Sequence, residues 1–208
     1  MEYEVRFYYP IKEYNDLFFK LKNISNLMYK GRFYEKTSQF NHPCLEYDFY
    51  SKEIDGRFRI RITKTEDNSK CKLSWKRRLP NSIDTRVNKE EELELSIKSE
   101  EYDNLMFIVL NVLHMEEVES YERYRTIFVN DEVEIVLDEY PFGLALEIET
   151  KVNENVSEII DKYVNLLNLD YKNSYRLSWD DKYEELCKEQ NKKIYNQVLF
   201  NKDMPEIK

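Results

Sequence analysis

The sequence predicts an α+β protein in which about eight strands close into a barrel. Three features of the 208-residue chain lead to this expectation. Polar and apolar residues alternate with a period of two through much of residues 2–150, which is typical of strands. Charged residues occupy alternate positions of these strands, and most strands carry mainly one sign. Apolar residues at helical spacing fill two internal segments and the C-terminal part.

In the N-terminal part, residues 2–9 alternate and predict a strand. Pro10 then opens a segment with apolar residues at helical spacing, so a helix is expected over residues 11–24. One or two strands are expected over residues 27–40, because the aromatic residues there favour extended backbone. Asn41-His42-Pro43 is a turn signal.

The middle of the chain reads as three alternating strands. Residues 49–54 are expected to be extended or irregular, and Asp55-Gly56 marks a hairpin turn. The three strands are expected over residues 57–62, 72–78 and 86–97, with turn signals at 65–69 and at Pro80-Asn81.

A second helix is expected over residues 100–113, with an apolar stripe formed by Leu105, Ile108, Val109 and Val112. Strands follow over residues 117–129, 133–137 and 144–150, separated by Asn130-Asp131 and by the segment from Pro141 to Gly143. The remainder is predicted to be helical, over about 157–167 and 179–198.

Composition excludes several kinds of chemistry. Three glycines cannot build a phosphate-binding Gly-rich loop or a dinucleotide-binding fingerprint. The two histidines, His42 and His114, lie far apart, which argues against a His-based triad or a His-rich zinc site. Three widely spaced cysteines fit reduced thiols. Any reaction would therefore use carboxylates, Lys, Arg and Tyr.

The sequence also indicates where the protein acts. No run of about 18 apolar residues exists to span a membrane. The N-terminus carries acids where a signal peptide would be basic and then apolar, so a cytoplasmic protein is expected. The net charge of −9 argues against general binding to duplex nucleic acid, although a local basic cavity is compatible with it.

The sorting of charge by strand is the main functional signal. Each charged face could be an ordinary solvated strand face, but such faces usually mix signs because like neighbours repel. Six of the expected strands carry like charges on one face, and a barrel with these faces turned inward explains all of them. A barrel of about eight strands can hold one small ligand. Arg and Lys suit phosphate oxygens, and paired glutamates suit Mg²⁺ or Mn²⁺. The acids lie at Glu2/Glu4, Glu90/Glu92/Glu94 and Glu147/Glu149, and the bases at Arg57/Arg59/Arg61, Lys72/Lys76/Arg78 and Arg123/Arg125.

These residues resemble the motifs of the CYTH superfamily, the triphosphate tunnel metalloenzymes. The family's E-x-E-x-K opening is similar to Glu2-Tyr3-Glu4-Val5-Arg6, with Arg in place of Lys. Further motifs follow in the family's order over residues 1–185: Pro43 before Arg59-Ile60-Arg61, Leu73-Ser74-Trp75-Lys76, Arg123-Tyr124-Arg125, Asp138 to Gly143, and Glu147-Ile148-Glu149. The resemblance implies an antiparallel eight-stranded β-tunnel with helices packed outside, a bound triphosphate, and Mg²⁺ or Mn²⁺.

The resemblance also assigns roles to residues. The metal ligands would be Glu2, Glu4, Asp138, Glu147 and Glu149, and Glu92 would be an additional tunnel acid. The triphosphate would be bound by Arg6, Arg59, Arg61, Lys76, Arg123 and Arg125. Glu4, Arg6, Lys76 and Asp138 are the expected catalytic residues, although Asp138 would equally well cap the turn that follows it.

The expected function is metal-dependent hydrolysis of a small-molecule triphosphate. Cyclisation of ATP to cyclic AMP is the main alternative, and an RNA 5′-triphosphatase and a non-catalytic sensor are two others. Residues 186–208 are expected to be a C-terminal helical extension of the 1–185 domain. The sequence leaves open whether the protein is a monomer or a homodimer.

Overall fold

The computed structural model describes residues 2–48, 56–65, 69–80 and 85–208, apart from the side chain of Glu2. The extended segment expected at 49–54, the Asp55 part of the hairpin turn, and parts of the turns at 65–69 and 80–81 lie outside these ranges. Within them, no helix is long and apolar enough to cross a membrane.

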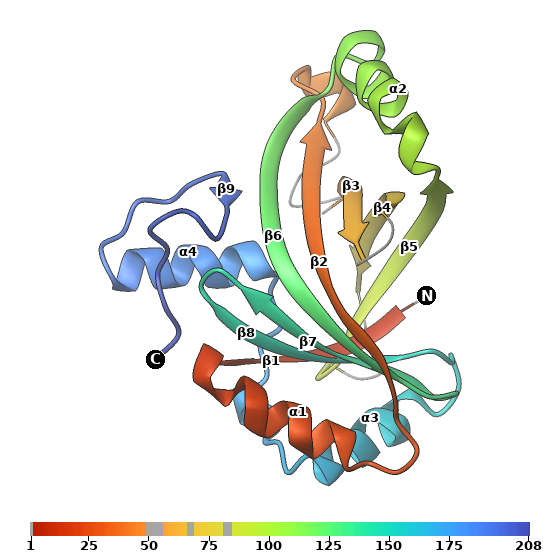
Figure 1. Cartoon of the computed structure of the whole chain (residues 1–208), viewed down its shortest axis with the longest axis vertical. Coiled ribbons are helices and arrows are strands. Elements are labelled where there is room, and N and C mark those ends of the chain that lie inside the picture. Colours follow the sequence, from red (N-terminus) through yellow and green to blue (C-terminus); the bar gives the residue numbers. More distant parts are fainter. Residues whose placement is uncertain (1, 49–55, 66–68, 81–84) are drawn as a thin grey trace.

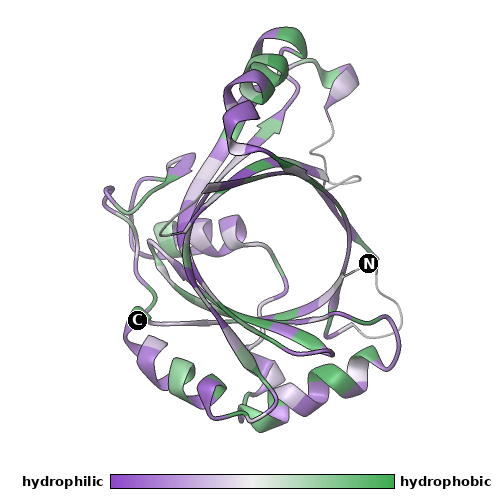
Figure 2. Ribbon diagram, turned by 45° about the vertical axis from the view of Figure 1, so that its right-hand side comes forward, coloured by the Kyte–Doolittle hydropathy of each residue, from purple (hydrophilic) through white to green (hydrophobic). Residues whose placement is uncertain are grey.

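Eight antiparallel strands form a closed barrel, as the sequence predicts (Figure 1, Figure 2). Their order around the barrel is β2-β3-β4-β5-β1-β8-β7-β6, and pairing of β6 with β2 closes it. The strands are β1 (Glu2–Tyr9), β2 (Met28–Asn41), β3 (Gly56–Lys64), β4 (Ser69–Leu79), β5 (Asn88–Ile97), β6 (Glu116–Val129), β7 (Val133–Tyr140) and β8 (Gly143–Thr150). A two-residue strand, β9 (Gln197–Val198), adds in parallel to β6.

The register of the strands brings the charged positions together on the inner face. Lys76 of β4 lies opposite Glu92 of β5, and Arg6 of β1 lies opposite Glu147 of β8. Because side chains two residues apart share a face, the alternate charged residues of each strand point into the barrel. The period-two pattern therefore places apolar residues outside and charged residues inside.

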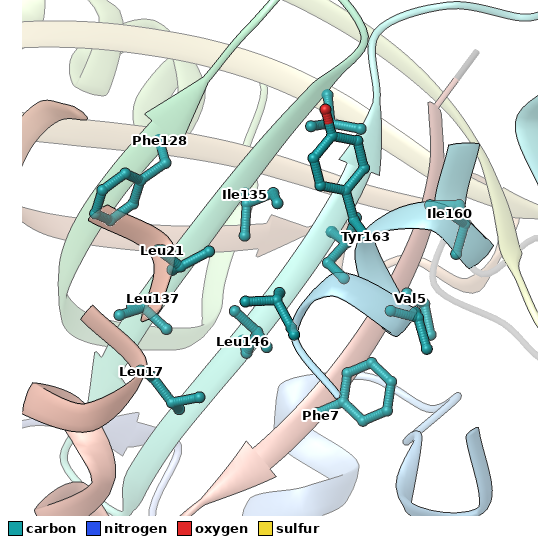
Figure 3. Close-up of a cluster of buried hydrophobic side chains, with 14 of the residues drawn as sticks. Val5, Phe7, Leu17, Leu21, Phe128, Ile135, Leu137, Leu146, Ile160 and Tyr163 are labelled. Atoms are coloured by element: carbon teal, nitrogen blue, oxygen red, sulfur yellow. The ribbon is translucent and has the colours of Figure 1, made fainter. Parts of the chain in front are cut away.

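The main hydrophobic core lies outside the barrel, beneath two helices (Figure 3). Helix α1 (Tyr14–Lys22), preceded by a 3₁₀ turn at Ile11–Glu13, and helix α3 (Val156–Leu166) cover the outer faces of β1, β7 and β8. Val5 of β1 and Leu146 of β8 pack there with Leu21 of α1 and Tyr163 of α3, all essentially inaccessible to water. This core fixes the strands that carry Glu4, Glu134, Glu147 and Glu149.

The second helical segment differs from the expected amphipathic helix. It consists of a 3₁₀ turn (Ser99–Glu101), helix α2 (Tyr102–Phe107) and a π-helical turn (Ile108–Val112). Of the predicted stripe, Val109 is buried, whereas Ile108 and Val112 are about half exposed, at 48% and 57%. The wider π turn, closed by the hydrogen bond from Leu113 N to Ile108 O, breaks the 3.6-residue period on which the stripe was based.

The last helix is shorter than predicted. Helix α4 (Trp179–Glu189) ends where Asn191 adopts a left-handed conformation, and Lys192 N donates to Cys187 O. This hydrogen bond and that from Asn191 N to Lys188 O form a Schellman motif, which terminates the helix. Residues 190–208 therefore form a largely irregular C-terminal strap that includes β9. The helix expected up to residue 198 ends at Glu189 instead.

Candidate functional site

The barrel encloses a charged cavity of about 250 Å³. Nine basic and seven acidic side chains of the described residues line it, so these charges nearly balance one another. Ten of the predicted site residues are among them: Glu4, Arg6, Arg59, Arg61, Lys76, Glu92, Arg123, Arg125, Glu147 and Glu149. Of the other two, Asp138 lies behind the lining, and the side chain of Glu2 is outside the described structure.

One wall of the cavity is strongly basic. Arg59 of β3 pairs with Glu92 at 2.8 Å, whereas Arg61 is 3.8 Å from Glu35 and donates to Thr37 Oγ1 at 3.2 Å. Burial and the nearby charge of Arg61 lower the pKa of Arg59. Burial alone would raise the pKa of Tyr121, but the adjacent arginines lower it to about 8. This wall therefore favours a bound anion.

Asp138 holds two arginines in place. Its carboxylate has no exposed surface and accepts hydrogen bonds from Arg123 Nη1 at 2.8 Å and from Arg125 at 2.7 and 2.6 Å. Glu35 of β2 accepts from the other side of Arg123, at 2.7 and 2.8 Å. Burial opposes ionisation of Glu35, but the surrounding arginines, Arg123 first, lower its pKa well below the usual range. Asp138 thus faces guanidinium groups, and the described contacts give it a positioning role.

Arg6 connects three parts of the site. It donates from Nε to Glu147 Oε1 at 2.6 Å, from Nη2 to Glu4 Oε1 at 3.1 Å, and from Nη1 to the backbone oxygen of Leu177 at 3.2 Å. Burial would raise the pKa of Glu147, but the charges of Arg6 and Arg125 lower it to about 2. Glu147 is therefore a carboxylate near neutral pH, held between two guanidinium groups.

Lys76 of β4 lies between two carboxylates on β5. Its Nζ is 2.7 Å from Glu90 Oε2 and 3.4 Å from Glu92 Oε2. Glu90 is almost completely buried, and Arg78 approaches its other oxygen at 3.4 Å. The arrangement places the Lys76 ammonium group in the cavity lining, with its charge balanced by the two carboxylates.

The opposite wall carries a row of carboxylates. In the strand register Glu149 of β8 lies between Glu4 of β1 and Glu134 of β7, and all three line the cavity. Carboxylates directly opposite one another repel unless positive charges offset them, and Arg6 supplies one to Glu4 at 3.1 Å. Among the described residues, however, no three His, Cys, Asp or Glu side chains are placed to hold a metal ion unaided. The row fits Mg²⁺ or Mn²⁺ because Mg²⁺ commonly takes one or two carboxylates together with substrate phosphates.

The first turn of α4 closes one side of the cavity. Trp179 lines the cavity and packs against Tyr121, with ring centroids 4.4 Å apart, and stacks on Tyr140. Ser178 forms a capping box with Asp181, which fixes where α4 begins. The helix thereby holds an aromatic side chain against Tyr121 of β6 and Tyr140 of β7.

Sequence reasoning missed several residues of the site. Glu35 shares a face with Thr37 and Gln39 in β2, and Glu134 shares one with Asp138 in β7. Both alternations are visible in the sequence. The prediction for residues 27–40, however, rests on their aromatic residues and not on their alternating polar residues. Trp179 gave no such signal, because its place in the cavity depends on where α4 packs.

Comparison with solved structures finds the same fold in proteins of bacteria, archaea and plants. PH1819 from Pyrococcus horikoshii matches with a TM-score of 0.65 and 25% identity, over 89% of this chain and 99% of that one. A candidate adenylate cyclase from Vibrio parahaemolyticus matches with a TM-score of 0.61 and 16% identity, over 86% and 96% of the two chains.

A third match comes from Hippeastrum. HpAC1, a candidate adenylyl cyclase with a dominant triphosphatase activity, gives a TM-score of 0.59 and 16% identity, over 94% of this chain and 99% of that one. No protein-family model and no curated protein matches the sequence. The closed antiparallel barrel with its charged interior has the architecture that the resemblance implies for a triphosphate tunnel. The chain has the CYTH fold, as the resemblance in its motifs predicts.

Proposed function

We propose that this protein hydrolyses inorganic triphosphate in a reaction that depends on Mg²⁺ or Mn²⁺. The observation that carries the proposal is the arginine wall of the barrel, formed by Arg59, Arg61, Arg123 and Arg125, which faces the carboxylate row across the cavity. An arginine wall alone would suit any polyanion. The carboxylate row adds a place for the divalent cation that accompanies a triphosphate.

Each wall has its own part in the reaction. Arg59, Arg61 and Lys76 bind phosphate oxygens from one side, and Arg123 and Arg125 bind them from the other. Glu4 and Glu149 hold the metal, which supplies positive charge against the phosphates. Water adds to the terminal phosphorus, the bond from that phosphorus to the bridging oxygen breaks, and phosphate, pyrophosphate and a proton released to solvent are the products.

The size of the cavity supports a small substrate. Its volume of about 250 Å³ is below the range of roughly 300–1,000 Å³ that is usual for drug-sized ligands. The lining is dominated by charged groups, and its aromatic residues Tyr121, Tyr140 and Trp179 pack against one another. Inorganic triphosphate fits this description better than a whole nucleotide does.

The test supplies inorganic triphosphate and ATP separately, with Mg²⁺ and then Mn²⁺, and quantifies phosphate, pyrophosphate and cyclic AMP. Phosphate release from triphosphate is expected, and Glu149→Gln should lower it by at least about 100-fold. The matched control is Glu91→Gln, a carboxylate that pairs with Arg77 and does not line the cavity, with a change within about twofold. Cyclic AMP with equal pyrophosphate would establish the cyclase alternative.

A further inference from the structure

We propose that Arg6 makes binding of the divalent metal depend on the presence of triphosphate. Its guanidinium group holds Glu4 and Glu147, and it exchanges these carboxylates for phosphate oxygens when the substrate enters. The inference rests on the proposed function, because it concerns the metal and the triphosphate of the same cavity.

The contacts of Arg6 engage one oxygen of Glu147 and one of Glu4. Nε and Nη2 engage Glu147 and Glu4, at 2.6 and 3.1 Å. The second oxygen of Glu147 accepts from Arg125 Nη2 at 3.2 Å, so both of its oxygens face guanidinium groups. A cation can reach Glu147 only if a guanidinium group moves away.

Burial makes such a displacement unfavourable for the metal alone. Arg6 is only 9% exposed and Glu4 3%. A metal that took the carboxylates would leave the Arg6 charge buried and unpaired, which is strongly unfavourable. Triphosphate removes this obstacle because its oxygens accept from the guanidinium group and also complete the coordination of the metal.

The exchange makes the two ligands mutually dependent. With metal and triphosphate both bound, every buried charge keeps an opposite partner. By linkage, triphosphate must then raise the affinity for metal by the same factor by which metal raises the affinity for triphosphate. The third contact of Arg6, to the backbone oxygen of Leu177 beside α4, anchors the guanidinium group beside Glu4 and Glu147.

The first measurement is the affinity for Mn²⁺ with no phosphate compound present, from the electron paramagnetic resonance signal of free Mn²⁺. Arg6→Met is expected to bind Mn²⁺ at least about tenfold more tightly than the unmodified protein. Arg59 pairs with Glu92, so Arg59→Met removes the same charge from the same cavity without affecting Glu4 or Glu147. The affinity of this variant for Mn²⁺ should stay within about threefold of that of the unmodified protein. If the affinity for Mn²⁺ rose equally in both variants, the effect would come from the charge of the cavity alone, and the proposal would be overturned.

The second measurement is binding of imidotriphosphate, a non-hydrolysable analogue, with and without Mn²⁺. Mn²⁺ should tighten this binding at least about tenfold in the unmodified protein and clearly less in Arg6→Met. Should Arg6→Met fail to fold, Arg6→Lys serves instead, because an ammonium group keeps the charge but cannot span all three acceptors.

The failures are distinguishable. An unmodified protein that binds Mn²⁺ alone as tightly as the Arg6 variant would overturn the role of Arg6 and leave the proposed function standing. Absence of any analogue binding, with or without Mn²⁺, would overturn both.

Discussion

The carboxylate of Asp138 holds the guanidinium group of Arg125 from behind, with hydrogen bonds of 2.7 Å to Nε and 2.6 Å to Nη2. The carboxylate is completely buried, whereas the side chain of Arg125 is 14% exposed and lines the cavity. Because the acid fixes the planar guanidinium group at two points, it sets the direction in which Arg125 can meet a ligand. A residue outside the cavity thus determines the geometry inside it.

Asp138→Asn should therefore weaken substrate binding. We expect the KM for triphosphate to rise about tenfold, and the free energy of unfolding to fall by about 3 kcal/mol, because two buried arginines lose their counter-charge. Steady-state kinetics and urea unfolding measure these changes. In the control Glu139→Gln, whose partner Arg32 is 40% exposed, the loss should stay below about 1 kcal/mol and the KM should not change. An unchanged KM in Asp138→Asn would contradict the positioning role.

Tyr121 predicts how triphosphate binding depends on pH. Its pKa is lowered to about 8 because Arg123, Arg61 and Arg59 outweigh the effect of burial. Above this pH the phenolate would neutralise part of the arginine wall and repel phosphate. The KM for triphosphate should therefore rise several-fold between about pH 7.5 and 9, and Tyr121→Phe should remove that rise. The control is Tyr124→Phe, on the opposite face of β6. If the KM of Tyr121→Phe still rose with pH to the same extent, the titrating group would be another residue.

Glu119 predicts how stability depends on pH. Burial and the negative charges of Asp180 and Glu184 in α4 raise its pKa to about 8, against partial compensation by Arg57. Since the folded pKa lies above the unfolded value, the favourable contribution of protonated Glu119 is complete below about pH 4.5. It declines as the pH rises and is lost once pH 8 is passed.

Glu119→Gln should therefore be more stable than the unmodified protein at high pH. The difference should be roughly 1 kcal/mol at about pH 9 and should vanish near pH 4.5, where Gln and protonated Glu are alike. Urea unfolding at several pH values measures it, with the exposed Glu116→Gln as control. A difference that is independent of pH would point to packing rather than ionisation.

The barrel could be predicted from the sequence because a single rule, period-two alternation, sets both the strands and the face of each side chain. The predicted inward charges of β3 and β6 are a direct consequence of that rule. The ion pairs could not be predicted from this alternation, because Arg6 and Glu147 are 141 residues apart and meet only through the strand register. The position where α4 ends was not predicted, because the residue that terminates the helix, Asn191, does not interrupt the helical spacing of the apolar residues.

The C-terminal strap fits against the barrel because residue 143 is glycine. A Cβ atom there would lie 2.5 Å from Ile207 Cδ1, in a backbone conformation with φ of +156°. Ile207 N also donates to Phe142 O at 2.9 Å, so the strap follows the β7–β8 turn closely. Gly143→Ala should push Ile207 off this turn and lower the free energy of unfolding by about 1–3 kcal/mol.

A double-mutant cycle with Ile207→Ala separates this clash from backbone strain. If the clash dominates, Gly143→Ala should cost at least about 1 kcal/mol less when Ile207 has been shortened, because the new methyl group then has space. Unfolding in urea measures all four proteins, and proteolysis at Lys202 reports release of the strap. An equal cost in both backgrounds would show that the φ angle of Gly143, and not its proximity to Ile207, requires glycine at this position.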